Sequence, residues 1–211
     1  TAQVAADTLG HGRAVPLDAT DSFDVVCLAV PMSAIPDAIA EHAEKATEAV
    51  VDVAGEMRNS VRALRTHADG RERASFHPLF SRANAPGSVP VVVDHGGPTI
   101  DRIRESLTEA GNDLFETTVA EHDRAMETVQ ARAHTAVLAY ALAAEDVDPR
   151  FHTSISGPLS ELVEQITGNT PAVYAEIQAR FEGSASIADA AAKLADADGD
   201  AFVDRYDEAE K

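Results

Sequence analysis

The sequence predicts an open α/β fold with a doubly wound, parallel or mixed sheet, followed by an all-helical region. In the first half of the chain, short apolar runs alternate with helix-like segments, which is the pattern of strands connected by crossover helices. After residue 119 the strand-like runs stop, and only helix-like segments follow. We therefore divide the chain into an α/β domain over residues 1–119 and a helical domain over residues 120–211.

Two apolar runs define the centre of the predicted sheet. Residues 24–30 and 49–54 are almost continuously apolar, which is typical of strands buried on both faces. Shorter or less regular strands are expected over residues 13–16, 74–76, 89–93 and 113–119, the last of them at an edge.

Helix signals fill the intervals between these strands. Residues 1–9 precede Gly10, which stands where a C-terminal cap belongs, and Pro98 suits the first turn of another helix. Residues 120–144 predict one long helix with almost no breakers. The remaining helices are expected over residues 33–46, 59–67, 98–110, 158–167, 171–181, 187–195 and 200–210.

The sequence begins at Thr1 without the Gly-rich turn that opens a dinucleotide-binding sheet. Gly10-His11-Gly12 follows the first helix and lacks a third glycine, so it is a poor substitute. We expect about thirty residues with the first β-α-β unit to precede this sequence. The α/β domain is then a Rossmann-like nucleotide-binding domain without its first strand and Gly-rich loop.

The strongly negative net charge of the chain argues against two classes of binding partner. Its 36 acidic and 17 basic residues give a net charge of −19, which repels nucleic acids and anionic membranes. No apolar run approaches the about 18 residues of a membrane span. Arginine far outnumbers lysine, and with abundant Asp, Glu and Ala this predicts a halophilic protein, because molar salt shortens the Debye length to about 3 Å. An acidic mesophilic protein is the alternative.

The remaining polar features predict neither a disulfide nor a metal site. Cys27 is the single cysteine and lies within an apolar run, so we expect a buried packing residue. The acidic residues between 196 and 210 include an Asp-x-Asp-x-Asp spacing, but Gly199 does not fit a calcium loop. We interpret them as solvated surface charge.

His77 is the first candidate for chemistry. It lies at the carboxyl end of a predicted strand, the edge at which open α/β sheets bind ligands. A histidine there can exchange a proton with a substrate near neutral pH. The alternative is a packed or capping histidine at the end of a strand.

A second group lies on the predicted long helix. Asp123, Gln130 and His134 share one face with Met126, because the eleven residues from 123 to 134 span about three turns. A polar stripe on an apolar helix predicts a partner or ligand. His122 is expected to make only local hydrogen bonds in the first turn.

These motifs together resemble the prephenate dehydrogenase family. The similarity rests on Asp24-Val-Val-Cys-Leu-Ala-Val-Pro31, Val51-Asp-Val-Ala-Gly55, Phe76-His-Pro-Leu-Phe80, Glu121-His-Asp123 with Met126, Gln130 and His134, and Tyr174-Ala-Glu-Ile177. The order and spacing agree from about residue 20 to the C-terminus. The His-Pro-Leu-Phe loop combined with Glu-His-Asp is the most specific part.

The resemblance implies that the protein uses NAD or NADP to convert prephenate to 4-hydroxyphenylpyruvate by oxidative decarboxylation, a step of tyrosine biosynthesis. It also implies a cytoplasmic homodimer that forms through the helical domain. It implies that His77 hydrogen-bonds the ring hydroxyl and helps to remove its proton. It assigns His134 and Gln130 to the substrate pocket. The residues expected to border the cofactor are Val30, Pro31, Ala54 and Gly55.

The chain departs from the family at two positions. Gly55 replaces a serine that meets substrate, and Gln165 stands where the family has a carboxylate-binding arginine. Arg82, Arg58 or Arg132 is our hypothesis for the replacement, since prephenate carries two carboxylates. Three alternatives stay open: an arogenate dehydrogenase, another nucleotide-dependent reductase of this fold, and a non-catalytic dimer that binds an aromatic metabolite.

Overall fold

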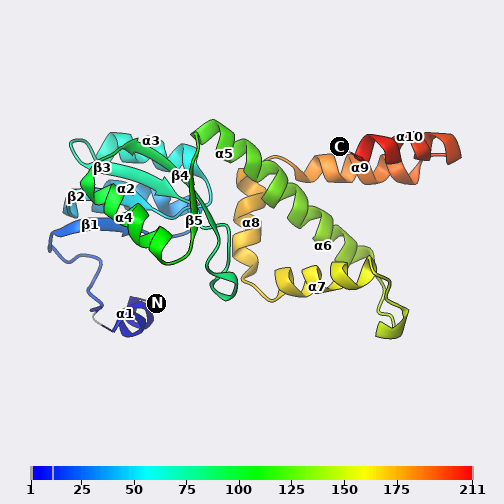
Figure 1. Cartoon of the computed structure of the whole chain (residues 1–211), viewed down its shortest axis with the longest axis horizontal. Helices are drawn as coiled ribbons and strands as arrows, with labels where there is room; N and C mark the ends of the chain where they lie inside the picture. The colour runs from blue at the N-terminus through cyan, green and yellow to red at the C-terminus, as the bar shows by residue number, and fades with distance from the viewer. Residues whose placement is uncertain (1, 11, 211) are drawn as a thin grey trace.

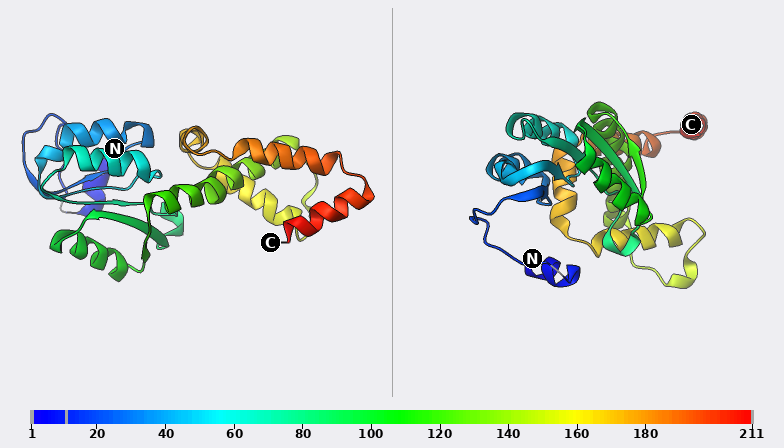
Figure 2. Two further views of the ribbon diagram at one scale, coloured as in Figure 1. Left: turned by 90° about the horizontal axis from the view of Figure 1, so that it is seen from above. Right: turned by 60° about the vertical axis from the view of Figure 1, so that its left-hand side comes forward.

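The computed structural model describes residues 2–10 and 12–210, which form an elongated molecule (Figure 1). A sheet with its helices occupies one end, and helices alone make up the other (Figures 1 and 2). Thr1 and His11, both of which entered the predictions for the N-terminal segment, lie outside the described residues. The strands are β1 (Phe23–Leu28), β2 (Ala46–Asp52), β3 (Glu72–Phe76), β4 (Ser88–His95) and β5 (Asp113–Glu116).

The sheet is mixed and its strands lie in chain order, β1-β2-β3-β4-β5. β1, β2 and β3 are parallel, β3 and β4 are antiparallel, and β4 and β5 are parallel. Residues 77–87 join β3 to β4 with only a 3₁₀ turn (Arg82–Asn84) between them, whereas parallel strands need a longer crossover, usually a helix. The predicted α/β class is therefore confirmed, in its mixed form.

Helices cover both faces of the sheet. Helices α2 (Ile35–His42) and α3 (Met57–His67) lie on one face, and α4 (Pro98–Glu109) lies on the other (Figure 2, left). Successive residues of β2 serve the two faces: Val50 packs with Ile39 and Leu64, whereas Val51 packs on the side of Ile100. This alternation follows from the two-residue period of a strand.

Two predictions about the first half of the chain are wrong. Residues 13–16 form no strand, because they have no ladder partner among the described residues and Pro16 has no N–H to donate. Cys27 is exposed and not buried, because β1 is an edge strand whose outer face borders an open apolar hollow in the described part of the chain. The helix expected over residues 33–46 is interrupted by 3₁₀ turns and ends before Ala46, where β2 begins.

The second half is helical, as predicted. Helix α5 (Val119–Met126) continues through a π-helical segment (Glu127–Arg132) into α6 (Ala133–Ala143). The helices that follow are α7 (Ser156–Thr167), α8 (Pro171–Arg180), α9 (Ser184–Ala195) and α10 (Gly199–Ala209), while the short α1 (Ala2–Leu9) lies apart at the N-terminus. The domain boundary that we predicted between residues 119 and 120 falls within the first turn of α5.

Helix α8 returns to the α/β part of the chain, where it contacts the turn that follows β1 and the π-helical segment. Ile177 and Phe181 are buried in the same cluster as Met32, Met126 and Ala131. No helix in the described part of the chain is long and apolar enough to cross a membrane. The same residues contain no group of three or more His, Cys, Asp and Glu side chains arranged to hold a metal.

Asp52, the last residue of β2, is a fully buried carboxylate. The Ala54 amide and the Ser75 hydroxyl both donate to its Oδ1 atom, each at 3.0 Å. Its Oδ2 atom has no hydrogen-bond partner among the described residues. Burial raises the pKa of Asp52 from 3.8 to about 6, so the folded protein favours the protonated carboxyl.

We expect Asp52→Asn to change the pH dependence of stability. The Asp52 contribution is fully present below pH 3.8 and is lost as the pH rises through about 6. Between these pH values the wild type should lose up to about 3 kcal/mol of unfolding free energy relative to Asp52→Asn. Urea unfolding of both proteins across this range measures the difference, and parallel pH curves would contradict the prediction.

Candidate active site

His77 lies directly after β3, at the carboxyl end of the strand, as the sequence predicts. Its backbone N–H donates to the carbonyl of Pro90 on β4 at 3.0 Å, which anchors the residue to the sheet. The residue is 7% exposed. His77 is therefore held rigidly and almost completely buried at the sheet edge.

A chain of hydrogen bonds joins His77 to Asp123 through His122. His77 Nδ1 lies 2.9 Å from His122 Nε2, and His122 Nδ1 lies 2.8 Å from Asp123 Oδ1. The expectation that His122 makes only local hydrogen bonds is wrong, because the first turn of α5 packs beside α3 and the end of β3. The adjacency of Glu121, His122 and Asp123 was the available signal, but the partner of His122 lies 45 residues earlier in the chain.

The carboxylate at one end of this chain determines where the protons lie. Ionised Asp123 can only accept, so His122 Nδ1 carries the proton between them, and His122 Nε2 presents a lone pair. His77 Nδ1 must then donate to that lone pair, which leaves a lone pair on His77 Nε2. Burial lowers the pKa of His77 to about 3, aided by His122 and opposed by Asp123. His77 Nε2 is thus a neutral hydrogen-bond acceptor.

Asp123 also ties the network to α3. Its Oδ1 atom accepts the backbone N–H of Met57, the first residue of α3, at 3.1 Å. Arg58 Nε lies 3.9 Å from Asp123 Oδ2, with a largely exposed side chain. The carboxylate therefore connects the start of α3 to the first turn of α5.

Two of the predicted residues surround His77 Nε2. The side-chain nitrogen of Gln130 lies 3.4 Å from it, in position to donate to the lone pair. A Cβ atom on Gly55 would lie 3.4 Å from the same nitrogen and 3.0 Å from Met32 Sδ, so a side chain at position 55 would crowd both groups. Gln130 belongs to the π-helical segment, and such segments are frequent at functional sites.

His134 lies one turn beyond Gln130, on α6. Its ring packs edge-on against Tyr174 of α8, with centroids 4.9 Å apart. Burial lowers the pKa of His134, and its Nδ1 atom has no hydrogen-bond partner among the described residues. The Gln130 Oε1 atom is likewise buried and unpartnered there.

The residues expected to border a cofactor follow the carboxyl ends of β1 and β2. Val30 and Pro31 come directly after β1, and Ala54 and Gly55 come after β2. The amide of Val53 donates to the carbonyl of Leu28 at 3.1 Å, which keeps the two strand ends side by side.

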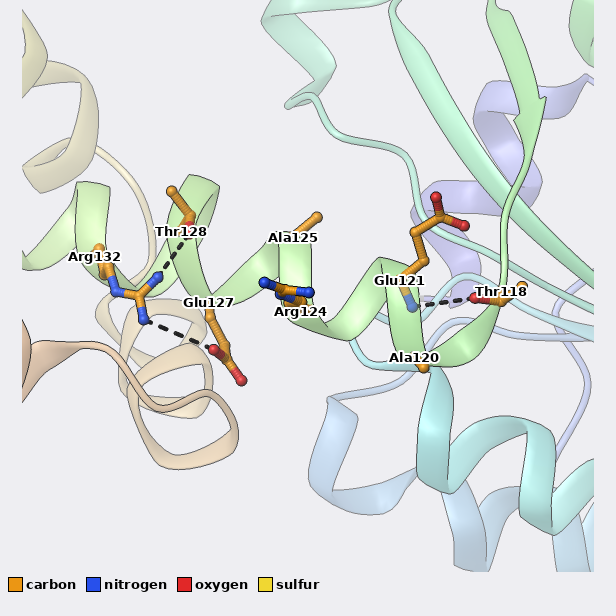
Figure 3. Close-up of a pocket in the computed structure, with 8 residues that line it drawn as sticks. All are labelled: Thr118, Ala120, Glu121, Arg124, Ala125, Glu127, Thr128 and Arg132. Carbon is orange, nitrogen blue, oxygen red and sulfur yellow. Dashed lines mark hydrogen bonds and ion pairs between the residues drawn. The ribbon is translucent and has the colours of Figure 1, made fainter. Parts of the chain in front are cut away.

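The candidate substrate clamps are not gathered beside His77. Arg82 is exposed on the turn between β3 and β4, and Gln165 is exposed on α7. Arg132 lines an open hollow of about 880 Å³, which His77, Gly55 and Gln130 do not line. There its guanidinium donates to Thr128 and lies 3.8 Å from Glu127 (Figure 3). Arg132 is therefore occupied away from His77.

Comparison with known proteins identifies relatives of the chain. It is 31% identical to a 4-amino-4-deoxyprephenate dehydrogenase of Streptomyces pristinaespiralis, over 76% of this chain, and spans 58% of the length of that relative. The fold is similar to prephenate dehydrogenase from Aquifex aeolicus in complex with hydroxyphenyl propionate and NAD+, at a TM-score of 0.70 and 15% identity, covering 97% of this chain and 79% of that one. It is also similar to arogenate dehydrogenase from Synechocystis, at a TM-score of 0.56 and 16% identity, covering 82% and 69% of the two chains. No family model matches the sequence.

The sheet, the helical region and the buried histidine at the sheet edge define the class: a Rossmann-like dehydrogenase fold with a helical domain. Within that class, the sequence similarity and the fold agree on one family. In sequence and in fold the chain is similar to members of the prephenate dehydrogenase family, as its motifs predict.

We expect Asp123→Asn to lower the free energy of unfolding by about 1–3 kcal/mol, because the hydrogen bond to His122 loses its charge and the Met57 amide loses a strong acceptor. Asp113→Asn is the matched control, since Asp113 is exposed on β5. Chemical denaturation at neutral pH measures both variants. Equal stability of Asp123→Asn and Asp113→Asn would contradict the buried network.

Proposed function

We propose that the chain forms most of an NAD- or NADP-dependent prephenate dehydrogenase, which converts prephenate to 4-hydroxyphenylpyruvate and carbon dioxide. The observation that carries the proposal is the neutral acceptor atom, His77 Nε2, fixed by His122 and Asp123 at the carboxyl edge of the sheet. In open α/β sheets this edge is where ligands bind. The sequence similarity to a 4-amino-4-deoxyprephenate dehydrogenase supports the same type of reaction.

The residues around His77 suit a planar cofactor ring. Gly55 presents no side chain toward His77 Nε2, and Val30, Pro31 and Ala54 follow the adjoining strand ends. We propose that these four residues border the nicotinamide of NAD or NADP, which supplies the hydride acceptor for the ring carbon that carries the hydroxyl.

His77 would act as the proton acceptor. The ring hydroxyl of prephenate donates to His77 Nε2, and its proton moves to that nitrogen as the carbon–oxygen bond becomes a carbonyl. The resulting positive charge is stabilised through His122 by the Asp123 carboxylate. Loss of carbon dioxide from the ring then restores aromaticity, and the proton returns to the phenol oxygen. The carbons, charges and protons therefore balance without another base.

Substrate groups farther from His77 have other candidate contacts. We propose that Gln130 and His134 line the pocket, because both carry a buried polar atom without a partner in the described structure. Arg82 and Arg58 remain proposals for holding the carboxylates, and Gln165 remains a proposed substrate contact. A neutral acceptor also suits an amino group on the ring, so 4-amino-4-deoxyprephenate joins arogenate among the alternative substrates.

We expect His77→Asn to lower kcat by about 10²–10⁴-fold, because asparagine fills the site without accepting a proton. The complete gene product is assayed for NAD(P)H formation with prephenate in molar KCl. His67→Asn, at an exposed position on α3, is the matched control and should retain activity. Full activity of His77→Asn would contradict the proposed role.

The wild type in the same assay separates the alternatives. Activity with arogenate or 4-amino-4-deoxyprephenate, but not with prephenate, would transfer the assignment to that substrate. A folded protein that binds an aromatic metabolite and never reduces NAD or NADP would favour the non-catalytic alternative.

We further propose that a second copy of the chain covers the helical domain. Helices α6, α7, α9 and α10 contribute no fully buried side chain in the described structure. Apolar side chains on and between these helices are exposed, among them Leu142, Phe151, Ile155 and Val203. Such surfaces are expected at the interface of a homodimer.

Light scattering in molar KCl should give twice the monomer mass, and Leu142→Glu should shift the protein toward the monomer. Leu142 is 90% exposed in the single chain, so a charge there is tolerated unless a partner covers it. Leu17→Glu is the control, because Leu17 is 78% exposed in the α/β part. A monomeric wild type would rule out the dimer.

A further inference from the structure

Glu176 of α8 reaches across to the turn that follows β1. Its Oε2 atom accepts the backbone N–H of Met32 at 3.0 Å, and its Oε1 atom accepts the hydroxyl of Ser33 at 2.5 Å. The first bond joins residues 144 positions apart in the sequence. One carboxylate therefore connects the helical part of the chain to the sheet.

The turn that Glu176 contacts needs an acceptor. Met32 begins a 3₁₀ turn that runs directly into α2, and its first N–H groups have no partner within the helix. The preceding residue, Pro31, provides no side-chain cap. Glu176 supplies the negative charge that favours a helix N-terminus, and the hydrogen bond from Ser33 lowers the pKa of Glu176.

Apolar packing reinforces this connection. Ile177 of α8 and Phe181, which directly follows the helix, are each 5% exposed and pack in the cluster that contains Met32. Met32 Sδ lies 3.0 Å from the position of a Cβ on Gly55, and that position lies 3.4 Å from His77 Nε2. Contacts thus run from Glu176 through Met32 to Gly55, which lies beside His77.

We propose that Glu176 is a positioning residue that clasps α8 onto the turn over residues 30–33 and so fixes one wall of the reaction site. The inference rests on the proposed function, because this turn borders the proposed cofactor position. Without the carboxylate, the turn and α8 move independently, and Met32 no longer holds a fixed place against Gly55. The loss should therefore weaken dinucleotide binding more than it slows proton transfer to His77.

The first experiment tests the contact of Glu176 with Met32 and Ser33 without measuring enzyme activity. Hydrogen–deuterium exchange of residues 30–36 is measured in the complete gene product, as wild type, Glu176→Gln and Glu176→Ala. Glu161→Gln is the matched control, since Glu161 is exposed on α7. We expect exchange to be about tenfold faster in Glu176→Ala, because the Met32 amide loses its charge-assisted hydrogen bond. Exchange should be intermediate in Glu176→Gln and unchanged in the control. Unchanged exchange in Glu176→Ala would contradict the proposal that Glu176 holds this turn in place, whatever reaction the protein catalyses.

Kinetics then test the positioning role. We expect KM for NAD or NADP to rise about tenfold in Glu176→Ala, with a smaller change in kcat, and Glu176→Gln to recover part of the loss. Ser33→Ala combined with Glu176→Ala should add little to Glu176→Ala alone, because both remove the same interaction. Faster exchange with unchanged KM and kcat would reduce Glu176 to a structural residue and overturn the positioning role.

Discussion

The site depends on one buried chain of hydrogen bonds, from Asp123 through His122 to His77. A carboxylate removed from water needs partners, and Asp123 finds them in His122 and the Met57 amide. The same carboxylate therefore holds the start of α3, the first turn of α5 and the end of β3 in a single arrangement. These elements cannot shift separately without leaving a buried charge unpaired.

The direction of the hydrogen bonds from His77 to Asp123 determines what the His77 ring can do. Because Asp123 fixes both rings, His77 presents a lone pair, and burial keeps its ring neutral. Gly55 presents no side chain toward this atom, and the π-helical segment brings Gln130 to it. Met32 also approaches Gly55, and its contact with Glu176 joins the helical part of the chain to the same site. A neutral acceptor held in a fixed position is what the proposed proton transfer to His77 requires.

Much of this arrangement could be predicted from the sequence, because apolar periodicity reports local structure. The strands, the helices and the position of His77 at the end of a strand are local features, and the apolar pattern predicts them. Residues 13–16 and Cys27 were misjudged, because pairing and burial depend on neighbours that the pattern does not specify. His122 was also misjudged, since its partner is distant in sequence, and a π-helical segment leaves no mark in the apolar spacing. The Glu176 contact could not be predicted for the same reason, as it joins residues 144 positions apart.

The protonation state of the His77 ring is the most direct measure of this network. Long-range ¹H–¹⁵N correlation spectra of the ¹⁵N-labelled protein, with His77→Asn to assign the signals, distinguish the two ring nitrogens. We expect a proton on Nδ1, a lone pair on Nε2, and no titration until the pH falls toward about 3. A proton on Nε2, or a titration near the ordinary value of 6.5, would contradict the network.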